Sequence, residues 1–316
     1  MKRAVCLLLA SMALSLSAGA QNISIATGGT GGVYYPMGGG IAAVLSKHVP
    51  GMQATAEVTG GSVDNLKLMA TGKPDIAFSM TDAGQDAYRG EDKSKGNKVP
   101  LKTLLILYPN RMHVVTVEGR SIARMSDLKG KRDSTGPPGS ATEVMAFRVI
   151  EAAGLDKDSD LKRERLGVAE SVNAVKDGKI DAFFWFGGLP TAGVTDLANT
   201  PNTKLKLIDH ADTVAVMNKK YGNLYVEDVI ARDVYRGMDA DNKQATVMNI
   251  LVSHESMDDK TAYSMVKAIF DKRDDLIAVH KESANIRLEN QKSSASPVPF
   301  HPRGSRSKDP GDDGLG

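Results

Sequence analysis

The sequence predicts an α/β protein of two lobes, each built on a mixed, mostly parallel sheet with flanking helices. Three observations support this prediction. Strand-like and helix-like segments alternate along the chain, one order of motifs occurs twice, and two β-rich segments are placed to cross between the lobes. Such alternation is typical of parallel sheets with helical crossovers. Because two lobes of one plan leave a cleft between them, we expect a small ligand to bind in that cleft.

The repeated order of motifs begins each time with a glycine-rich loop that leads into an apolar helix. In the first copy the loop at 27–33 precedes a helix expected over 34–49, and the Gly-Gly-Ser turn at 60–62 precedes a second helix. In the second copy the loop at 134–142 opens a helix, and the segment from Ser171 matches the one from the earlier turn. Each copy therefore places a helix N-terminus and a strand end at the shared cleft.

Two β-rich segments are expected to connect the lobes at a hinge. We interpret the apolar stretch 104–117 as the first crossing and 245–253 as the return. A helix expected over 258–270 would then pack back on the first lobe, because its apolar residues fall on one face. The predicted lobes are residues 22–111 plus 251–292 for lobe one and residues 112–250 for lobe two.

The two ends of the chain are expected to lie outside the lobes. Lys2 and Arg3 precede an apolar stretch too short to span a bilayer and a small-residue cleavage site, which predicts a signal peptide over residues 1–20, cleaved after Ala20. Such a signal predicts a periplasmic protein, and an uncleaved membrane anchor is the alternative. Residues 293–316 are dominated by Ser, Gly and Pro, so we expect a disordered tail.

Composition argues against several functions. Without Lys2 and Arg3 the chain has 38 basic and 38 acidic residues, so it lacks the basic surplus of a nucleic-acid-binding protein. The single cysteine, Cys6, lies in the signal, which excludes disulfides, cysteine catalysis and Cys-ligated metals in the mature chain. The six histidines are scattered and no nucleophile elbow occurs. We therefore expect neither catalytic residues nor a metal or cofactor.

The two glycine-rich loops are the first candidates for a binding site. A glycine-rich loop ahead of a helix offers free N–H groups and the positive end of the helix dipole, which suit an anion. The nucleotide-binding P-loop and dinucleotide patterns are both absent. Ser140 and Thr142 are expected to add hydroxyl groups to the second loop. For either loop alone, a tight turn without a ligand is the alternative.

Strand ends and one serine supply further candidates. Ser62 opens a helix after two glycines, and a simple N-cap role is its alternative. The last residues of two matching strands can reach the cleft, which selects Thr81, Asp82 and Trp185. Tyr34 lies beside the first loop with a second tyrosine next to it; we expect one of the two to line the cleft and the other to pack in the core.

Seven motifs occur together in one order: 27–36 (Thr-Gly-Gly-Thr-Gly-Gly-Val-Tyr-Tyr-Pro), 59–66 (Thr-Gly-Gly-Ser-Val-Asp-Asn-Leu), 75–78 (Asp-Ile-Ala-Phe), 127–132 (Asp-Leu-Lys-Gly-Lys-Arg), 138–144 (Pro-Gly-Ser-Ala-Thr-Glu-Val), 177–184 (Asp-Gly-Lys-Ile-Asp-Ala-Phe-Phe) and 286–290 (Ile-Arg-Leu-Glu-Asn). They cover nearly all of residues 22–292. With them the chain resembles solute-binding receptors of TRAP transporters of the TAXI family, often labelled immunogenic surface proteins.

The resemblance implies a two-lobe periplasmic binding protein of the type II-like kind, with two crossover strands at the hinge. It implies capture of a small carboxylate-bearing solute, an organic acid or an amino acid such as glutamate, and delivery to TRAP-type membrane permease subunits. We expect a monomer. The family's three cleft motifs map here to Thr30, Gly31, Ser62, Gly139, Ser140 and Thr142.

The chain departs from the family's pattern at two places, and two other functions are alternatives to solute transport. After Pro-Phe-His-Pro at 299–302 the chain lacks the family's aromatic, basic helix, so a terminal helix of lobe one is expected to be missing. The loop near Gly237 has Tyr-Arg-Gly where the family tends to have Tyr-Pro-Gly. A receptor that presents its ligand to a sensor kinase, or a surface protein without a transport role, is the alternative function. An exported enzyme is the third.

Overall fold

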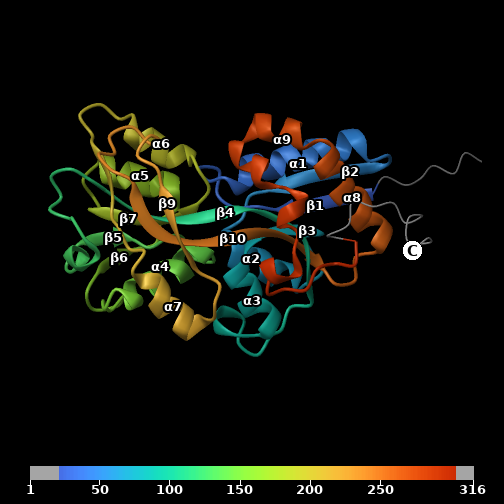
Figure 1. Ribbon diagram of the computed structural model, residues 1–316, viewed down its shortest axis with the longest axis horizontal. Helices are drawn as coiled ribbons and strands as arrows, with labels where there is room; N and C mark the ends of the chain where they lie inside the picture. The colour runs from blue at the N-terminus through green and yellow to red at the C-terminus, as the bar shows by residue number, and fades with distance from the viewer. Residues whose placement is uncertain (1–20, 304–316) are drawn as a thin grey trace, which may run out of the picture.

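The computed structural model describes residues 21–303 of the chain. The signal peptide predicted over 1–20, with its cleavage site, and residues 304–316 of the predicted tail lie outside this range. Within it the strands form one mixed sheet, and helices cover both of its faces (Figure 1). The predicted α/β architecture is confirmed.

The strands of this sheet alternate with helices over most of the chain. The strands are β1 (Gln21–Ala26), β2 (Met52–Glu57), β3 (Ile76–Met80), β4 (Leu101–Val117), β5 (Arg132–Ser134), β6 (Lys162–Glu164), β7 (Ala182–Gly187), β8 (Leu205–Leu207), β9 (Val226–Ile230) and β10 (Asn242–His254). The α-helices are α1 (Tyr34–His48), α2 (Ser62–Met69), α3 (Thr81–Arg89), α4 (Ala141–Ala152), α5 (Val168–Lys176), α6 (Ala192–Ala198), α7 (Thr213–Tyr221), α8 (Asp259–Asp271) and α9 (Arg273–Val279).

The strand order shows the duplication that the motifs predicted. The main path of the sheet reads β2-β1-β3-β10-β4-β7-β5-β6, and β8 and β9 join β4 and β10 at the side. Three parallel strands stand at each end, and each set meets a long antiparallel strand, β10 or β4. We call the β1–β3 end with its helices lobe one and the β5–β7 end with its helices lobe two. The predicted boundaries at 111/112 and 250/251 fall inside β4 and β10 and stay predictions.

Strands β4 and β10 run along the length of the molecule, from the helices of lobe one to the helices of lobe two (Figure 1). They pair with each other over most of their length. Their side chains are buried on both faces in long stretches, which is the pattern of a strand covered by helices on both sides. Helix α8 packs on α1 and β4 through buried Met265, Val266 and Ile269, so the expected return of this helix to lobe one is confirmed.

The expectation of a disordered tail is wrong for residues 293–303. The amide of Thr103 donates to the carbonyl of Pro299 over 2.9 Å, and the amide of His301 donates to the carbonyl of Thr103 over 2.8 Å. Val298 is fully buried. The first half of β4 has β10 on only one side, so its other edge offers unpaired N–H and C=O groups. The tail segment covers that edge, which composition alone does not reveal.

Over residues 21–303 no helix combines the length and the apolar character that crossing a membrane requires. The same part of the chain contains no group of three or more His, Cys, Asp or Glu side chains arranged to hold a metal ion.

Asp133 on β5 is an ionisable group that the fold buries without a partner. Neither carboxyl oxygen forms a hydrogen bond within the described residues. Burial, together with the nearby carboxylate of Asp181, raises the pKa of Asp133 to about 8. A carboxyl whose pKa is higher in the folded than in the unfolded chain stabilises the fold at low pH and loses that contribution as the pH rises through the folded value.

We therefore expect Asp133→Asn to alter the pH dependence of stability. Between the ordinary pKa of 3.8 and the folded value of about 8, the unfolded chain has released the Asp133 proton that the folded chain keeps, so the free energy of unfolding falls by about 1.4 kcal/mol per pH unit. Denaturant unfolding of both proteins at pH 5, 6 and 7 should show that the free energy of unfolding of the variant, relative to that of the original chain, rises by about 1.4 kcal/mol per pH unit. Parallel stability curves would contradict the assignment.

Candidate functional site

A cavity of about 100 Å³ lies between the two lobes. Both lobes and the crossing strand β4 contribute to its wall. Its lining comprises 28–34, 60–62 and Met80 from lobe one, Pro137, 140–142, 167–170 and 185–187 from lobe two, and Tyr108 and Asn110 from β4. The carboxyl ends of the parallel strands of both lobes meet here, which is the edge where open α/β sheets bind ligands.

Four helices begin at this cavity, two from each lobe. The first residues of α1, α2, α4 and α5 all belong to its lining. The opening N–H groups of a helix have no acceptor within the helix. Within residues 21–303 the following amides at the lining have no hydrogen-bond acceptor: Tyr34, Ser62, Ala141, Thr142, Val168, Ala169 and Glu170. The cavity therefore combines unpaired donors with the positive ends of four helix dipoles.

Charged side chains contribute little to this lining. It contains no Lys, Arg or His, and its one charged residue is Glu170, which is exposed. An anion held here would consequently be bound by backbone N–H groups and hydroxyl groups. This is the recognition that helix N-termini provide for phosphate, sulfate and carboxylate groups.

The structure brings seven of the ten predicted site residues to the cavity. They are Thr30, Gly31, Tyr34, Ser62, Ser140, Thr142 and Trp185. Tyr34 lines the cavity, but the second tyrosine, Tyr35, is 37% exposed, so the expectation that it packs in the core is wrong. The Tyr34 hydroxyl donates to Oδ1 of Asn249, and its ring packs on Phe78 with the centroids 5.0 Å apart.

Thr81, Asp82 and Gly139 are not part of the lining. β3 ends at Met80, and the chain turns directly into α3, so Thr81 and Asp82 are buried in the first turn of that helix and do not join the lining. The Asp82 carboxylate pairs with Arg148 over 3.3 Å, and burial raises its pKa. Alternation along the strand could not show that the turn carries Asp82 away from the cleft.

Arg148 joins the two lobes beside the cavity. From α4 it also contacts Asp86 over 2.6 Å and Asp92 over 3.0 Å, both in lobe one, and its guanidinium donates to the Tyr225 hydroxyl over 2.6 Å. Burial, which outweighs the attraction of Arg148, raises the pKa of Asp86 to about 6. Removing Arg148 would leave the fully buried Asp82 carboxylate without a cation, a loss that is typically strongly destabilising.

Gly139 takes part in closing the site. The amide of Asp64 in lobe one donates to the carbonyl of Gly139 over 3.0 Å, and the amide of Gly193 in lobe two donates to the carbonyl of Gly31 over 3.3 Å. Both bonds span the cleft. The structure therefore shows the two lobes in direct contact over the cavity.

Trp185 closes the cavity against the first glycine loop. A Cβ atom added at Gly32 would lie 2.8 Å from Cη2 of Trp185, closer than such contacts allow. The indole N–H of Trp185 donates to Oγ1 of Thr191 over 2.9 Å. The tryptophan is thus a wall of the cavity, and its N–H group is already bonded within lobe two.

The hydroxyl groups of Ser62, Ser140 and Thr142 differ in their hydrogen bonds within the protein. Ser140 is the N-cap of α4: its hydroxyl accepts from the amide of Glu143 over 3.1 Å and donates to the carbonyl of Pro137 over 2.7 Å. Ser62 is the first residue of α2 instead of its N-cap, and its hydroxyl accepts from the amide of Met80 over 3.3 Å. The Thr142 hydroxyl has no hydrogen bond among the described residues.

Sequence reasoning missed the segment 167–170 and the β4 residues Tyr108 and Asn110. The start of α5 corresponds in the second motif copy to the Gly-Gly-Ser turn of the first, and that correspondence was the available signal. Tyr108 and Asn110 lie two residues apart on a strand, so alternation places them on one face.

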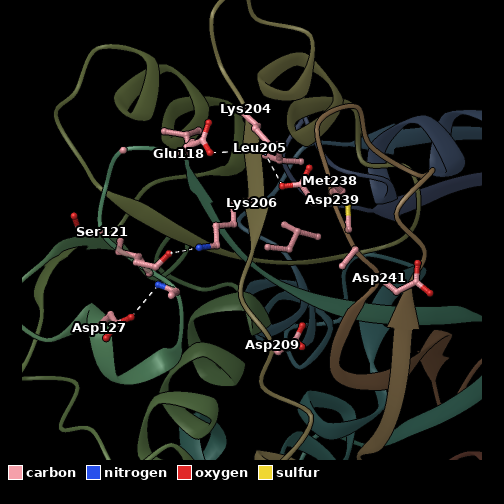
Figure 2. A pocket seen from close by; sticks show the side chains of 16 residues that line it. Glu118, Ser121, Asp127, Lys204, Leu205, Lys206, Asp209, Met238, Asp239 and Asp241 are labelled. Carbon is pink, nitrogen blue, oxygen red and sulfur yellow. Dashed lines mark hydrogen bonds and ion pairs between the residues drawn. The ribbon is translucent and has the colours of Figure 1, made fainter.

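A wider, open hollow of about 730 Å³ lies in lobe two (Figure 2). Its charged side chains are engaged within the protein. Lys204 pairs with Asp239 over 2.7 Å, Lys206 donates to the carbonyl of Ile122, and Asp209 accepts from Nδ2 of Asn242. The hollow therefore lacks the converging unpaired donors of the interlobe cavity.

A family model decides the relationship of this chain to known proteins. The model, described as the NMT1-like family, matches residues 25–306. The chain belongs to the NMT1-like family.

Solved structures share the fold of this NMT1-like chain. MatC from Rhodopseudomonas palustris with bound malate has a TM-score of 0.60 and 12% identity, over 87% of this chain and 93% of MatC. A structure described as a periplasmic transporter has a TM-score of 0.54 and 15% identity, over 84% of this chain and 87% of its own. A protein of Bordetella bronchiseptica RB50 has a TM-score of 0.53 and 18% identity, covering 90% and 84%. The predicted periplasmic-binding-protein fold is confirmed.

Gly32→Ala should prevent the NMT1-like chain from closing fully. The added Cβ meets Trp185 across the cleft, and the backbone at Gly32 needs no left-handed conformation, so the Trp185 ring must shift or lobe two must move. We expect ligand affinity to fall at least about tenfold, a cost near 1.4 kcal/mol, with little loss of thermal stability. Calorimetric titration of a ligand into the variant and into the original chain measures this difference in affinity.

Gly39→Ala is the matched control for that substitution. Gly39 is an exposed residue of α1 outside the cavity lining, and a Cβ there meets nothing within 4 Å. Its affinity should equal that of the original chain. Equal affinities for the Gly32 and Gly39 variants would rule out the role of the Gly32–Trp185 contact.

Proposed function

We propose that this chain is a periplasmic solute-binding protein that captures a small carboxylate-bearing solute between its lobes and delivers it to a TRAP-type membrane permease. One observation carries the proposal. Four helix N-termini, two from each lobe, present unpaired N–H groups to one cavity that has no cationic side chain. A carboxylate is small, planar and anionic, and it accepts several such hydrogen bonds at once.

Lobe closure would couple binding to a change of shape. Only the closed arrangement brings the helix starts of both lobes to one ligand, so the ligand binds the closed state more tightly than the open one. A ligand shifts a conformational equilibrium by that difference in affinity. The interlobe bonds of Gly139 and Gly31 are weak enough to break on opening, since a single backbone bond contributes about 1 kcal/mol net.

Several further observations support the finer parts of the proposal. The predicted signal peptide supports a periplasmic location, and the TAXI resemblance of the cleft motifs supports a TRAP-type permease as the partner. The structurally similar MatC was solved with malate, a carboxylate. The proposed binding residues are the predicted ones that line the cavity: Thr30, Gly31, Tyr34, Ser62, Ser140, Thr142 and Trp185.

Thermal-shift and calorimetric screening of small acids tests this function. Each acid is compared with its carboxamide, propionate with propionamide for example, because the amide keeps the shape and loses the charge. A bound acid at 100 times its Kd should stabilise the protein by about 2.7 kcal/mol. Emission of Trp185, the single tryptophan, should change on binding. Equal binding of acids and amides, or no binding by any acid, would contradict the proposal.

Substitutions at α4 separate binding from capping. Thr142→Val removes a hydroxyl that has no partner within residues 21–303, so we expect affinity to fall about tenfold with stability unchanged. Ser140→Ala removes the N-cap of α4, so we expect a loss of about 1 kcal/mol of stability. Denaturant unfolding and calorimetry on both variants check this. Unchanged affinity in the Thr142 variant would exclude its hydroxyl from the site.

A further inference from the structure

Two residues that line the cavity each carry a buried polar atom without a hydrogen-bond partner in the described part of the chain. These atoms are the hydroxyl oxygen of Tyr108 and Oδ1 of Asn110, and no group among residues 21–303 bonds to either. The residues are 0% and 2% exposed, and both line the cavity from β4. A buried polar group without a partner usually costs about 1–3 kcal/mol. Two of them in one cavity indicate an occupant that supplies the missing partners.

The packing around these residues holds both atoms in place. Nδ2 of Asn110 donates to the carbonyl of Phe186 over 3.4 Å, so reversing the amide would turn Oδ1 toward another oxygen. The ring of Tyr108 packs on Gly188, where an added Cβ would lie 2.7 Å from Cε2. The two residues therefore offer a hydroxyl group, which can donate or accept, and an amide oxygen held as an acceptor.

We propose that Tyr108 and Asn110 together recognise a hydroxyl group on the ligand, so that the site selects small hydroxycarboxylates. This inference rests on the proposed function, because the helix N-termini bind the carboxylate. A hydroxyl accepts a hydrogen bond from Tyr108 and donates one to Asn110, which satisfies both atoms with one group. The specificity then lies in β4, apart from the loops that hold the anion.

Other substituents at the same position leave at least one hydrogen-bonding function of these two groups unsatisfied. A methylene group satisfies neither. An ammonium group can donate to both oxygens, but it has no lone pair for the proton of Tyr108, which stays unpaired. It would also need a carboxylate nearby, and the one acidic side chain in the lining, Glu170, is exposed. For this reason, a site built to form hydrogen bonds with a hydroxyl group strongly rejects analogues that lack that group.

Two matched series of ligands test the inference by calorimetry. L-Lactate, propionate and L-alanine differ only in a hydroxyl, hydrogen or ammonium substituent, as do L-malate, succinate and L-aspartate. In at least one series the hydroxy acid should bind at least about tenfold more tightly than both analogues. Tyr108→Phe should reduce that preference about tenfold, measured as the ratio of the affinities for the hydroxy acid and the unsubstituted acid.

Tyr108→Phe should fold normally, because the hydroxyl that it removes bonds to nothing in the described chain. Asn110→Ala is the second variant and should remove the same preference. Equal binding of hydroxy and unsubstituted acids, tightest binding of the amino acid, or an unchanged preference in both variants would overturn the inference while leaving carboxylate binding intact. Failure of every acid to bind would overturn the proposed function, and this inference with it.

Discussion

Unpaired backbone N–H groups at the starts of four helices are the constraint on which the arrangement of the site depends. In a parallel sheet, each strand leads through a loop into a helix, so the helix starts gather at the carboxyl edge of the strands. Each lobe contributes two such helices, and the duplicated topology turns them toward one another. The site thus needs no cationic side chain, and its donors are positioned by main-chain geometry.

The shared strands explain how the lobes can face each other at short range. β4 and β10 join the strands of the two lobes into one sheet, so the helices of both lobes pack on the same sheet. The contacts over the cavity are the backbone hydrogen bonds to Gly31 and Gly139 and the packing of Gly32 against Trp185. Because glycine has no side chain, the lobes can approach closely at these positions. Beside them, Arg148 ties α4 to three carboxylates of lobe one.

The sequence predicts most of the architecture because the duplicated motifs report local features. Glycine loops ahead of apolar helices correctly place the starts of α1, α2 and α4, and the apolar run at 104–117 correctly indicates the crossing strand β4. The start of α5 at Val168 carries no such glycine cluster. Only its correspondence to the Gly-Gly-Ser turn of the first motif copy indicates its place at the cavity.

The errors of the sequence analysis have physical causes that a one-dimensional pattern does not contain. Asp82 ends a predicted strand, but the immediate turn into α3 points it toward Arg148. Residues 293–303 have the composition of a disordered segment, yet they pair with a free strand edge at Thr103. The polar atoms of Tyr108 and Asn110 sit within a strand whose apolar character dominates the pattern.

Amide chemical shifts test the central claim most directly, since the claim concerns backbone N–H groups. In a ¹⁵N-labelled sample, addition of a carboxylate that binds should shift the amide signals at the starts of all four helices, including Tyr34, Ser62, Thr142 and Val168. The shifts should run downfield, as expected for N–H groups that begin to donate to an anion. Shifts confined to one lobe, or centred on the open hollow near Lys204 and Asp239, would contradict the account.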